Sequence, residues 1–156
     1  MGWRDIDVYW MRKALVLAKQ AEKQGEVPVG AVLLLNGTLI VTASNQTITQ
    51  CDPTAHAEML VLRKAAKTVN NHRLLGSTLY VTLEPCLMCT GAMIHARISR
   101  LVFAAYDNPS VTSGSVFSIL QNQGIHHRFL ITDGLLADES AEILREFFVQ
   151  RRRGLN

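Results

Sequence analysis

The chain has 156 residues, enough for one domain with a hydrophobic core and too few for two comfortable ones, so we expect residues 1–156 to form a single domain. Its composition, 48% apolar and 19% charged, is ordinary for a globular protein, and no apolar run is long enough to span a bilayer. The first residues lack the basic and then apolar pattern of a secretion signal. A formal charge of +3 does not by itself indicate a nucleic-acid partner.

The first third of the chain predicts one helix and a β-hairpin. Residues 5–24 predict an amphipathic helix, whose apolar stripe consists of Val8, Met11, Leu15 and Ala18. Gly25 predicts the end of this helix. Residues 29–35 and 38–44 are two β-rich runs joined by Asn36-Gly37, a dipeptide typical of tight hairpins because both residues tolerate the positive φ of a type I′ turn.

The rest of the chain alternates between helices and strands. After a polar loop, Asp52 or Thr54 is expected to cap a helix over about residues 55–68, with Pro53 suited to its first turn. The further predicted strands are 78–83, 100–105 and 128–132, and the further predicted helices are 86–96, 116–121 and 138–153. This order predicts an α/β fold, a five-stranded mixed sheet with helices on both faces.

Two short motifs, each at the start of a predicted helix, carry residues that bind metals. One holds His56 and Glu58, two residues apart, and the other holds Cys86 and Cys89 just after a proline. Zinc takes nitrogen and sulfur ligands, and a catalytic zinc site has three protein ligands and an open position for water. We therefore predict that His56, Cys86 and Cys89 bind Zn(2+), and that Glu58 is the general acid and base.

The positions of the two cysteines suit this role. Free backbone N–H groups at a helix start lower the pKa of a thiol, and a spacing of three residues puts both sulfurs on one side of the helix. Bound zinc lowers the pKa of its water toward neutrality, which makes hydroxide available. Glu58 would not share a face with His56 on a regular helix, so we do not expect it to be a ligand. Helical periodicity does not show how its carboxylate reaches the water.

A CxxC pair alone is a weak signal, because redox pairs and structural zinc sites use it as well. A redox role leaves His56 and Glu58 without a use, and a structural zinc site requires a fourth protein ligand. Cys51 could supply that ligand, but it has no thiol partner nearby in sequence, and we interpret it as a free thiol. Three cysteines without a disulfide pattern favour a reducing, cytoplasmic compartment.

Four segments carry a family resemblance: residues 28–32 (PVGAV), 52–58 (DPTAHAE) and 82–94 (TLEPCLMCTGAMI), and the FF…RRR ending of the last helix. Together they resemble the bacterial tRNA adenosine deaminases of the cytidine/deoxycytidylate deaminase superfamily. The resemblance covers roughly residues 5–153. The metal motif alone would indicate only the superfamily, whereas the flanking segments and the last helix indicate the tRNA enzymes.

The resemblance implies a three-layer α/β/α cytidine-deaminase-like fold and a homodimer with one zinc ion per subunit. The implied substrate is a tRNA anticodon stem-loop, whose wobble adenosine becomes inosine. Glu58 would take a proton from zinc-bound water, and the hydroxide would attack C6 of the purine. By position in the family pattern, Asn45 would contact the flipped nucleotide and Asp107 a neighbouring ribose. Without the resemblance, both residues read equally well as ordinary turn residues.

The arginine run at the end of the chain has two interpretations. It suits the negative end of the helix macrodipole without any partner, and composition alone favours this reading. The resemblance favours an RNA contact instead, with Arg152 binding a phosphate and Phe148 offering a surface for base stacking. Because adjacent helical residues rarely share an environment, Phe147 or Phe148 is expected to belong to the core.

Two rival functions remain open on the sequence. A small-molecule deaminase acting on guanine, cytosine or a nucleoside would share every metal-binding residue, but it has no evident need for a basic last helix. A non-catalytic, zinc-stabilised RNA-binding module would not need Glu58, because a structural metal does not require an adjacent general acid.

Overall fold

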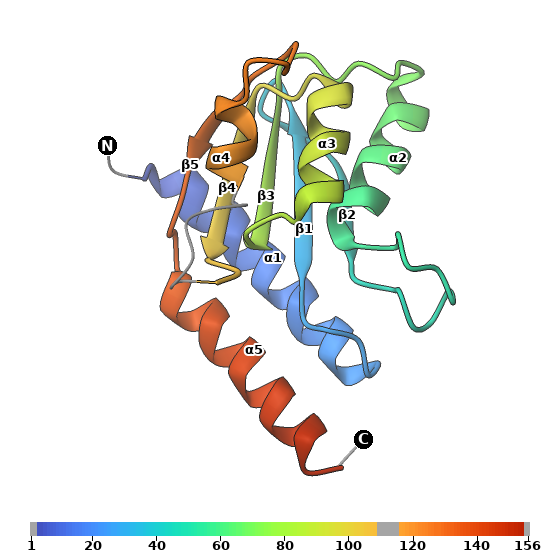
Figure 1. Cartoon of the computed structure of the whole chain (residues 1–156), viewed down its shortest axis with the longest axis vertical. Coiled ribbons are helices and arrows are strands. Elements are labelled where there is room, and N and C mark those ends of the chain that lie inside the picture. Colours follow the sequence, from blue (N-terminus) through green and yellow to red (C-terminus); the bar gives the residue numbers. More distant parts are fainter. Residues whose placement is uncertain (1–2, 109–115, 155–156) are drawn as a thin grey trace.

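The computed structural model describes residues 3–108 and 116–154, and it contains a five-stranded sheet and five helices within them (Figure 1). The strands are β1 (Gly30–Leu35), β2 (Thr38–Ser44), β3 (Ser77–Leu83), β4 (Arg100–Ala105) and β5 (Leu130–Thr132). The helices are α1 (Asp5–Lys23), α2 (Ala57–Val69), α3 (Leu87–Ala96), α4 (Val116–Gln121) and α5 (Ala137–Arg152). The strand order is β2-β1-β3-β4-β5, with β1 antiparallel to both of its neighbours and the β3–β4 and β4–β5 pairs parallel. The prediction of a mixed sheet is confirmed.

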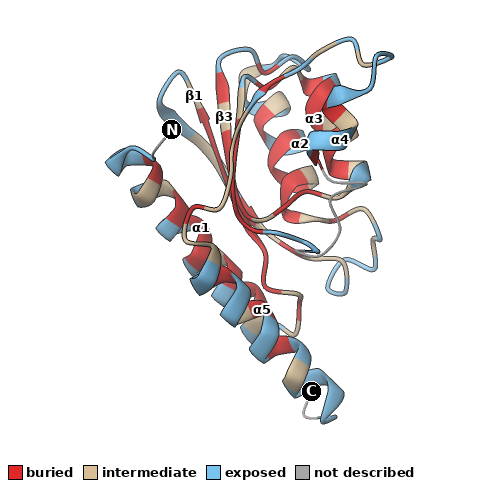
Figure 2. Ribbon diagram, turned by 60° about the vertical axis from the view of Figure 1, so that its left-hand side comes forward, coloured by how far each residue is buried: buried red, intermediate tan, exposed pale blue. Residues whose placement is uncertain are grey.

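Helices cover both faces of the sheet, which gives three layers (Figure 2). Side chains of β3 and β4 alternate between two cores, as the two-residue period of a strand requires. Leu79 and Phe103 face the core under α2, α3 and α4, whereas Tyr80 and Val102 face the core that includes Met11 of α1. α5 lies on the same side of the sheet as α1 and contacts β3 and β4.

The hairpin turn forms as predicted, and a glycine allows α1 to approach the sheet. Asn36 and Gly37 have φ values of 49° and 83°, as a type I′ turn requires. At the start of β1, a Cβ on Gly30 would lie 2.0 Å from the carbonyl oxygen of Ala14. Gly30 therefore sets how closely α1 packs on β1, which accounts for the glycine of the PVGAV segment.

The strand directions gather several loops at one edge of the sheet. β3 and β4 are parallel and end at Leu83 and Ala105, and the N–H of Glu84 donates to the carbonyl of Ala105 at 2.8 Å. At the same edge, the end of β2 pairs with Gly30 at the start of β1. In α/β sheets such an edge is the usual place for a ligand site, because loops from several strands converge there.

The predicted cap of α2 was wrong. Asp52 accepts hydrogen bonds from the N–H and Oγ1 of Thr54 at 2.8 and 2.7 Å, upstream of the helix. The N-cap residue is His56, and the helix begins at Ala57, whose N–H donates to Oδ1 of Asn45 at 3.1 Å. The capping group thus comes from a residue twelve positions earlier, which local capping rules do not consider. Pro53 consequently lies before the helix and not in its first turn.

The other element boundaries agree with the predictions to within two residues. α3 begins one residue late, because Cys86 is its N-cap, and α5 begins and ends one residue early. β5 is shorter than predicted because Arg128 precedes it and donates to the carbonyls of Leu120, Asn122 and Ile125. Residues 109–115, between the predicted strand over 100–105 and the predicted helix over 116–121, lie outside the described residues. Among the described helices, none is long and apolar enough to cross a membrane.

Candidate active site

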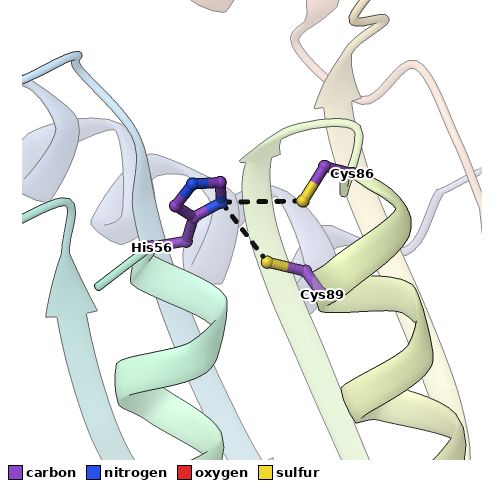
Figure 3. Close-up of side chains that lie close together, drawn as sticks. All are labelled: His56, Cys86 and Cys89. Carbon is purple, nitrogen blue, oxygen red and sulfur yellow. Dashed lines mark hydrogen bonds between the residues drawn. The ribbon is translucent and has the colours of Figure 1, made fainter. Parts of the chain in front are cut away.

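The fold brings the two predicted metal-binding motifs together (Figure 3). His56 precedes α2, and Cys86 and Cys89 lie at the start of α3, so both helices begin at the same edge of the sheet. Nδ1 of His56 lies 3.6 Å from Sγ of Cys86 and 3.5 Å from Sγ of Cys89. The three candidate ligand atoms all lie within 4.8 Å of one another.

These separations fit a tetrahedral metal ion. Zinc binds sulfur at about 2.3 Å and nitrogen at about 2.0–2.1 Å, which places tetrahedral nitrogen and sulfur ligands about 3.6 Å apart. The observed nitrogen–sulfur distances therefore suit two ligands of a shared ion better than a donor and an acceptor. Cys51 is exposed, its thiol faces the carbonyl of Ile48, and it is not part of the group, which confirms its interpretation as a free thiol.

The two thiols interact strongly with each other. The hydrogen bond from Cys89 lowers the pKa of the Cys86 thiol to about 5, against the opposing effect of burial. The same bond raises the pKa of Cys89, and burial raises it further. Both thiols have to be thiolates to bind a metal, so metal binding at this pair releases protons.

Glu58 lies beside the metal ligands. It belongs to the first turn of α2, two residues after His56, and is only 4% exposed. Burial raises the pKa of Glu58, against the hydrogen bonds from its own N–H and from Cys89. His56 has extended backbone angles (φ −68°, ψ 150°) and lies outside the helix, so helical faces do not describe how it lies relative to Glu58.

An open cavity of about 530 Å³ leads to this centre. Its lining includes His56, Glu58 and Cys86, and it continues between the ends of β3 and β4 and one side of α5. Pockets for small ligands commonly measure about 300–1,000 Å³, so the cavity has room for a nucleoside. A buried carboxylate next to three metal-ligating side chains at the bottom of such a cavity is suited to hydrolysis by activated water.

Comparison with known proteins identifies the family. Residues 4–105 match the model of the cytidine and deoxycytidylate deaminase zinc-binding region. The chain is 49% identical over 149 residues to a tRNA-specific adenosine deaminase of Haemophilus influenzae, covering 95% of this chain and 86% of the relative. The chain belongs to this deaminase family. It is also 43% identical over 147 residues to the tRNA-specific adenosine deaminase of Bacillus subtilis, covering 94% of this chain and 91% of the relative.

Solved structures support the same assignment. A structure from a study of A-to-I editing by tRNA:A34 deaminases has a TM-score of 0.82 at 43% identity, covering 87% of this chain and 99% of the other. A guanine deaminase from Bacillus subtilis has a TM-score of 0.62 at 28% identity, covering 92% of both chains. The predicted cytidine-deaminase-like fold is confirmed. The protein is therefore an enzyme, a deaminase that uses water to release ammonia, and this excludes the non-catalytic RNA-binding module.

Three of the predicted substrate residues of the deaminase line the cavity. Asn45 is buried and also caps α2 through its side-chain oxygen, so it is more than an ordinary loop residue. Asp107 is exposed at the end of β4, and its N–H donates to Oε1 of Glu84 at 3.3 Å. Phe148 is 43% exposed and lines the cavity from α5, whereas its neighbour Phe147 is buried in the core.

The fourth predicted residue, Arg152, does not reach the cavity. It is exposed at the end of α5 and is not among the residues of the lining. Its neighbour Arg151 is tied to the body of the deaminase, since its guanidinium donates to the carbonyl of Gly25 at 2.6 Å and lies over the ring of Phe147. An RNA contact by Arg152 would therefore lie outside the cavity, farther along the bound strand.

Sequence reasoning missed two charged residues of the cavity. Glu84 is buried, and its Oε2 has no hydrogen-bond partner among the described residues. Its place directly before the PCxxC motif, at the end of an apolar strand, was a signal that could have marked it. Arg145 lines the cavity from α5, one turn before Phe148. A lone arginine on an amphipathic helix gives no such signal.

Proposed function

We propose that this deaminase converts the wobble adenosine of a tRNA anticodon, position 34, to inosine. Relatives of 43–49% identity over nearly the whole chain are named tRNA-specific adenosine deaminases, and a structural neighbour comes from work on tRNA:A34 deaminases. The observation that carries the proposal is the cavity itself, in which α5 supplies an exposed aromatic ring opposite the metal centre. An unstacked base requires such a surface, whereas a paired base would keep its reacting atom out of reach.

The proposed mechanism assigns proton transfer to Glu58. Zinc held by His56, Cys86 and Cys89, one ion per subunit, would supply a water of lowered pKa. Glu58 would accept one proton from this water and pass it to a ring nitrogen of the purine as the new C–O bond forms at C6. It would then take the proton of the new C6 hydroxyl and pass it to the amino group, which leaves as ammonia while the C6 carbonyl forms. One water is consumed, and the products are inosine and ammonia. Burial beside the ligands supports this role, because a carboxylate there can exchange protons without competition from bulk water.

The remaining predicted contacts follow from the lining of the cavity. Asn45 is held rigidly by its bond to the N–H of Ala57, which suits a residue that contacts the flipped nucleotide. Asp107 would accept a hydrogen bond from a neighbouring ribose, and Phe148 would stack on a base. Arg152 would bind a phosphate outside the cavity.

The setting of the reaction completes the proposal. We propose that residues 1–156 act as a single domain, as a homodimer and in the cytoplasm, with the tRNA anticodon stem-loop as partner. The cysteine content, three thiols without a disulfide pattern, agrees with a reducing compartment.

Deamination of a free base is a second candidate, because guanine deaminases share the fold at 26–28% identity. A product assay separates the two. The purified zinc-loaded enzyme is given either tRNA with adenosine at the wobble position or free guanine, cytosine, adenosine and cytidine. We expect inosine at that one tRNA position, lost in Glu58→Ala with the zinc content unchanged. Ammonia released only from a free base or nucleoside would refute the proposal.

A further inference from the structure

The charges around the cavity are unfavourable for RNA except at one point. The lining contains the carboxylates of Glu58, Glu84 and Asp107, and it includes one lysine or arginine, Arg145, among the described residues. A polyanion that places a nucleotide here meets carboxylates of like charge in the lining. Arg145 is the side chain of the lining that can offset this repulsion.

The guanidinium of Arg145 is hydrogen-bonded to the carboxylate of Glu142, one turn earlier on α5. Its Nε donates to Oε2 of Glu142 at 3.0 Å, and one of its terminal nitrogens donates to Oε1 of the same residue. The two side chains are 62% and 52% exposed. The pair is thus bidentate and well oriented, yet it lies in water, where such an ion pair contributes little to stability.

We propose that Arg145 binds a backbone phosphate next to the reacting nucleotide, and that this phosphate takes the place of the Glu142 carboxylate. The inference rests on the proposed tRNA substrate. A flipped nucleotide keeps its two phosphates while its base enters the cavity, so the phosphates stay near the mouth, where Arg145 stands on the same side of α5 as Phe148. The guanidinium fork that fits a carboxylate fits two phosphate oxygens equally well. The exchange therefore needs no rearrangement of the helix.

Steady-state kinetics on a wobble-adenosine anticodon stem-loop test this assignment. In Arg145→Ala we expect KM to rise about tenfold, the loss of one charge-assisted contact, with kcat changed less than about twofold. The slope of log affinity against log salt should fall by about one, because one phosphate contact is gone. The KM of Arg145→Lys should lie between those of the wild type and Arg145→Ala, since an ammonium keeps the charge but not the bidentate geometry of the guanidinium. In Glu142→Gln, which frees the guanidinium, KM should fall about twofold.

Arg12→Ala is the matched control. Arg12 also forms an exposed bidentate ion pair with a carboxylate of α5, Glu139, but it does not line the cavity. Its loss should leave KM and the salt slope unchanged.

The outcomes distinguish this inference from the proposed function. If the wild-type enzyme forms inosine in the stem-loop but Arg145→Ala keeps the wild-type KM and salt slope, the phosphate contact is refuted and the tRNA activity stands. A higher KM in Glu142→Gln would show that Glu142 positions Arg145 and does not compete with the phosphate, which refutes the exchange. A wild-type enzyme that acts only on free bases refutes both.

Discussion

Two clusters of buried polar side chains on opposite faces of the sheet use their hydrogen-bonding capacity differently. One surrounds Asp7, in the first turn of α1. The other surrounds Glu58, in the first turn of α2, together with the metal ligands and Glu84. Both carboxylates are buried at a helix start, where the macrodipole favours negative charge. Their partners decide what each of them does.

The Asp7 cluster is fully satisfied. Tyr80 donates its hydroxyl to Asp7 at 2.7 Å, the Arg100 guanidinium donates twice at 2.9 and 3.1 Å, and the N–H of Arg4 donates at 3.0 Å. Burial alone would raise the pKa of Asp7, but the hydrogen bonds from Arg100 and Tyr80 outweigh it and hold the pKa well below its usual value. Burial and the bond to Asp7 in turn raise the pKa of Tyr80. Such a network stabilises one arrangement of α1, β3 and β4.

The Glu58 cluster is incomplete. Burial is the largest effect on the pKa of Glu58 and raises it, and the opposing effects of its own N–H, Cys89 and His56 do not offset this. Among the described residues, Nε1 of Trp10 and Oγ1 of Thr90 are buried without hydrogen-bond partners away from the cavity, whereas Oε2 of Glu84 is buried without one in the cavity lining. Polar groups left unsatisfied in a native structure require a reason, and here a metal ion, water and substrate can supply it. We interpret the saturated hydrogen bonds around Asp7 as stabilising the fold, and the unsatisfied oxygen in the cavity as available to metal, water or substrate.

Glu58→Gln should show the largest effect. The amide keeps the shape of the carboxylate but cannot accept and return a proton, so we expect kcat on the stem-loop to fall about 10³-fold or more. The free energy of unfolding should change little, because the amide keeps the shape of a side chain whose charged form burial disfavours. The inosine assay measures kcat and chemical denaturation measures the free energy of unfolding. Zinc analysis shows whether the variant holds as much metal as the wild type. A variant that is unstable but active would reverse the assignment.

Asp7→Asn is the corresponding isosteric change in the other cluster. It should lower stability and leave activity nearly unchanged. The free energy of unfolding should fall by about 3 kcal/mol, because Arg100 loses the partner that compensates its partly buried charge. The activity per folded molecule should stay within about twofold. Asp5→Asn is the matched control, since Asp5 lies in the same helical turn but is exposed. It should cost less than about 1 kcal/mol.

The pH dependence of stability sharpens this contrast. The pKa of Asp7 is lower in the folded chain than its ordinary value of 3.8. Its contribution is therefore complete above about pH 5 and is lost as the pH falls through the unfolded-state pKa toward the folded one, by up to about 1.4 kcal/mol per pH unit. The stability difference between the wild type and Asp7→Asn, from denaturation at pH 7 to 3, should shrink accordingly. A constant difference would show that Asp7 acts through shape and not through charge.

Regular patterns in the sequence determined most of the fold correctly. The strand over 100–105, a continuous apolar run after Arg100, and the helix over 116–121 were predicted to the residue, since both depend on residues close together in the sequence. The exceptions are the starts of α2 and α3. His56 and Cys86 occupy the cap positions there, but their side chains face the metal site and make no capping bond. Capping statistics favour residues such as Asp52, which here forms a turn of its own.

The sequence predicted the part of the candidate site that consists of short motifs. The HxE and PCxxC spacings gave His56, Cys86 and Cys89 as ligand candidates, and the structure brings them together. The place of Glu84 and Arg145 in the lining depends instead on how the strand ends and α5 come together, which no local spacing encodes. The hydrogen bond of Asn45 to α2 is likewise a contact between distant segments.

Glu26 is a buried carboxylate close to the active site, and its substitution tests whether full hydrogen bonding marks a structural residue. Of the substitutions close to the active site, we expect this one to have the smallest effect on catalysis. It lies next to Val27 of the cavity lining, yet it is fully buried and satisfied. Its carboxylate accepts bonds from Oγ1 of Thr47, the N–H of Ile48, and the N–H and Oγ1 of Thr49. Burial would raise the pKa of Glu26, but the bonds from Thr49 outweigh this and lower it. Because its carboxylate is fully hydrogen-bonded, we expect Glu26, like Asp7, to contribute to stability and not to catalysis, although it lies near the cavity.

In Glu26→Gln, one oxygen becomes an NH₂ group that faces donors and has no acceptor to bind. We expect the free energy of unfolding to fall by about 2 kcal/mol, while kcat and KM on the stem-loop change less than about threefold. Glu22→Gln, on the preceding turn of α1 and only partly buried, provides the reference. A loss of kcat as large as that of Glu58→Gln, without loss of stability, would show that hydrogen-bond saturation does not separate structural from catalytic carboxylates in this enzyme. The loop of residues 47–49, which leads from β2 toward His56, would then have to be counted as part of the catalytic apparatus.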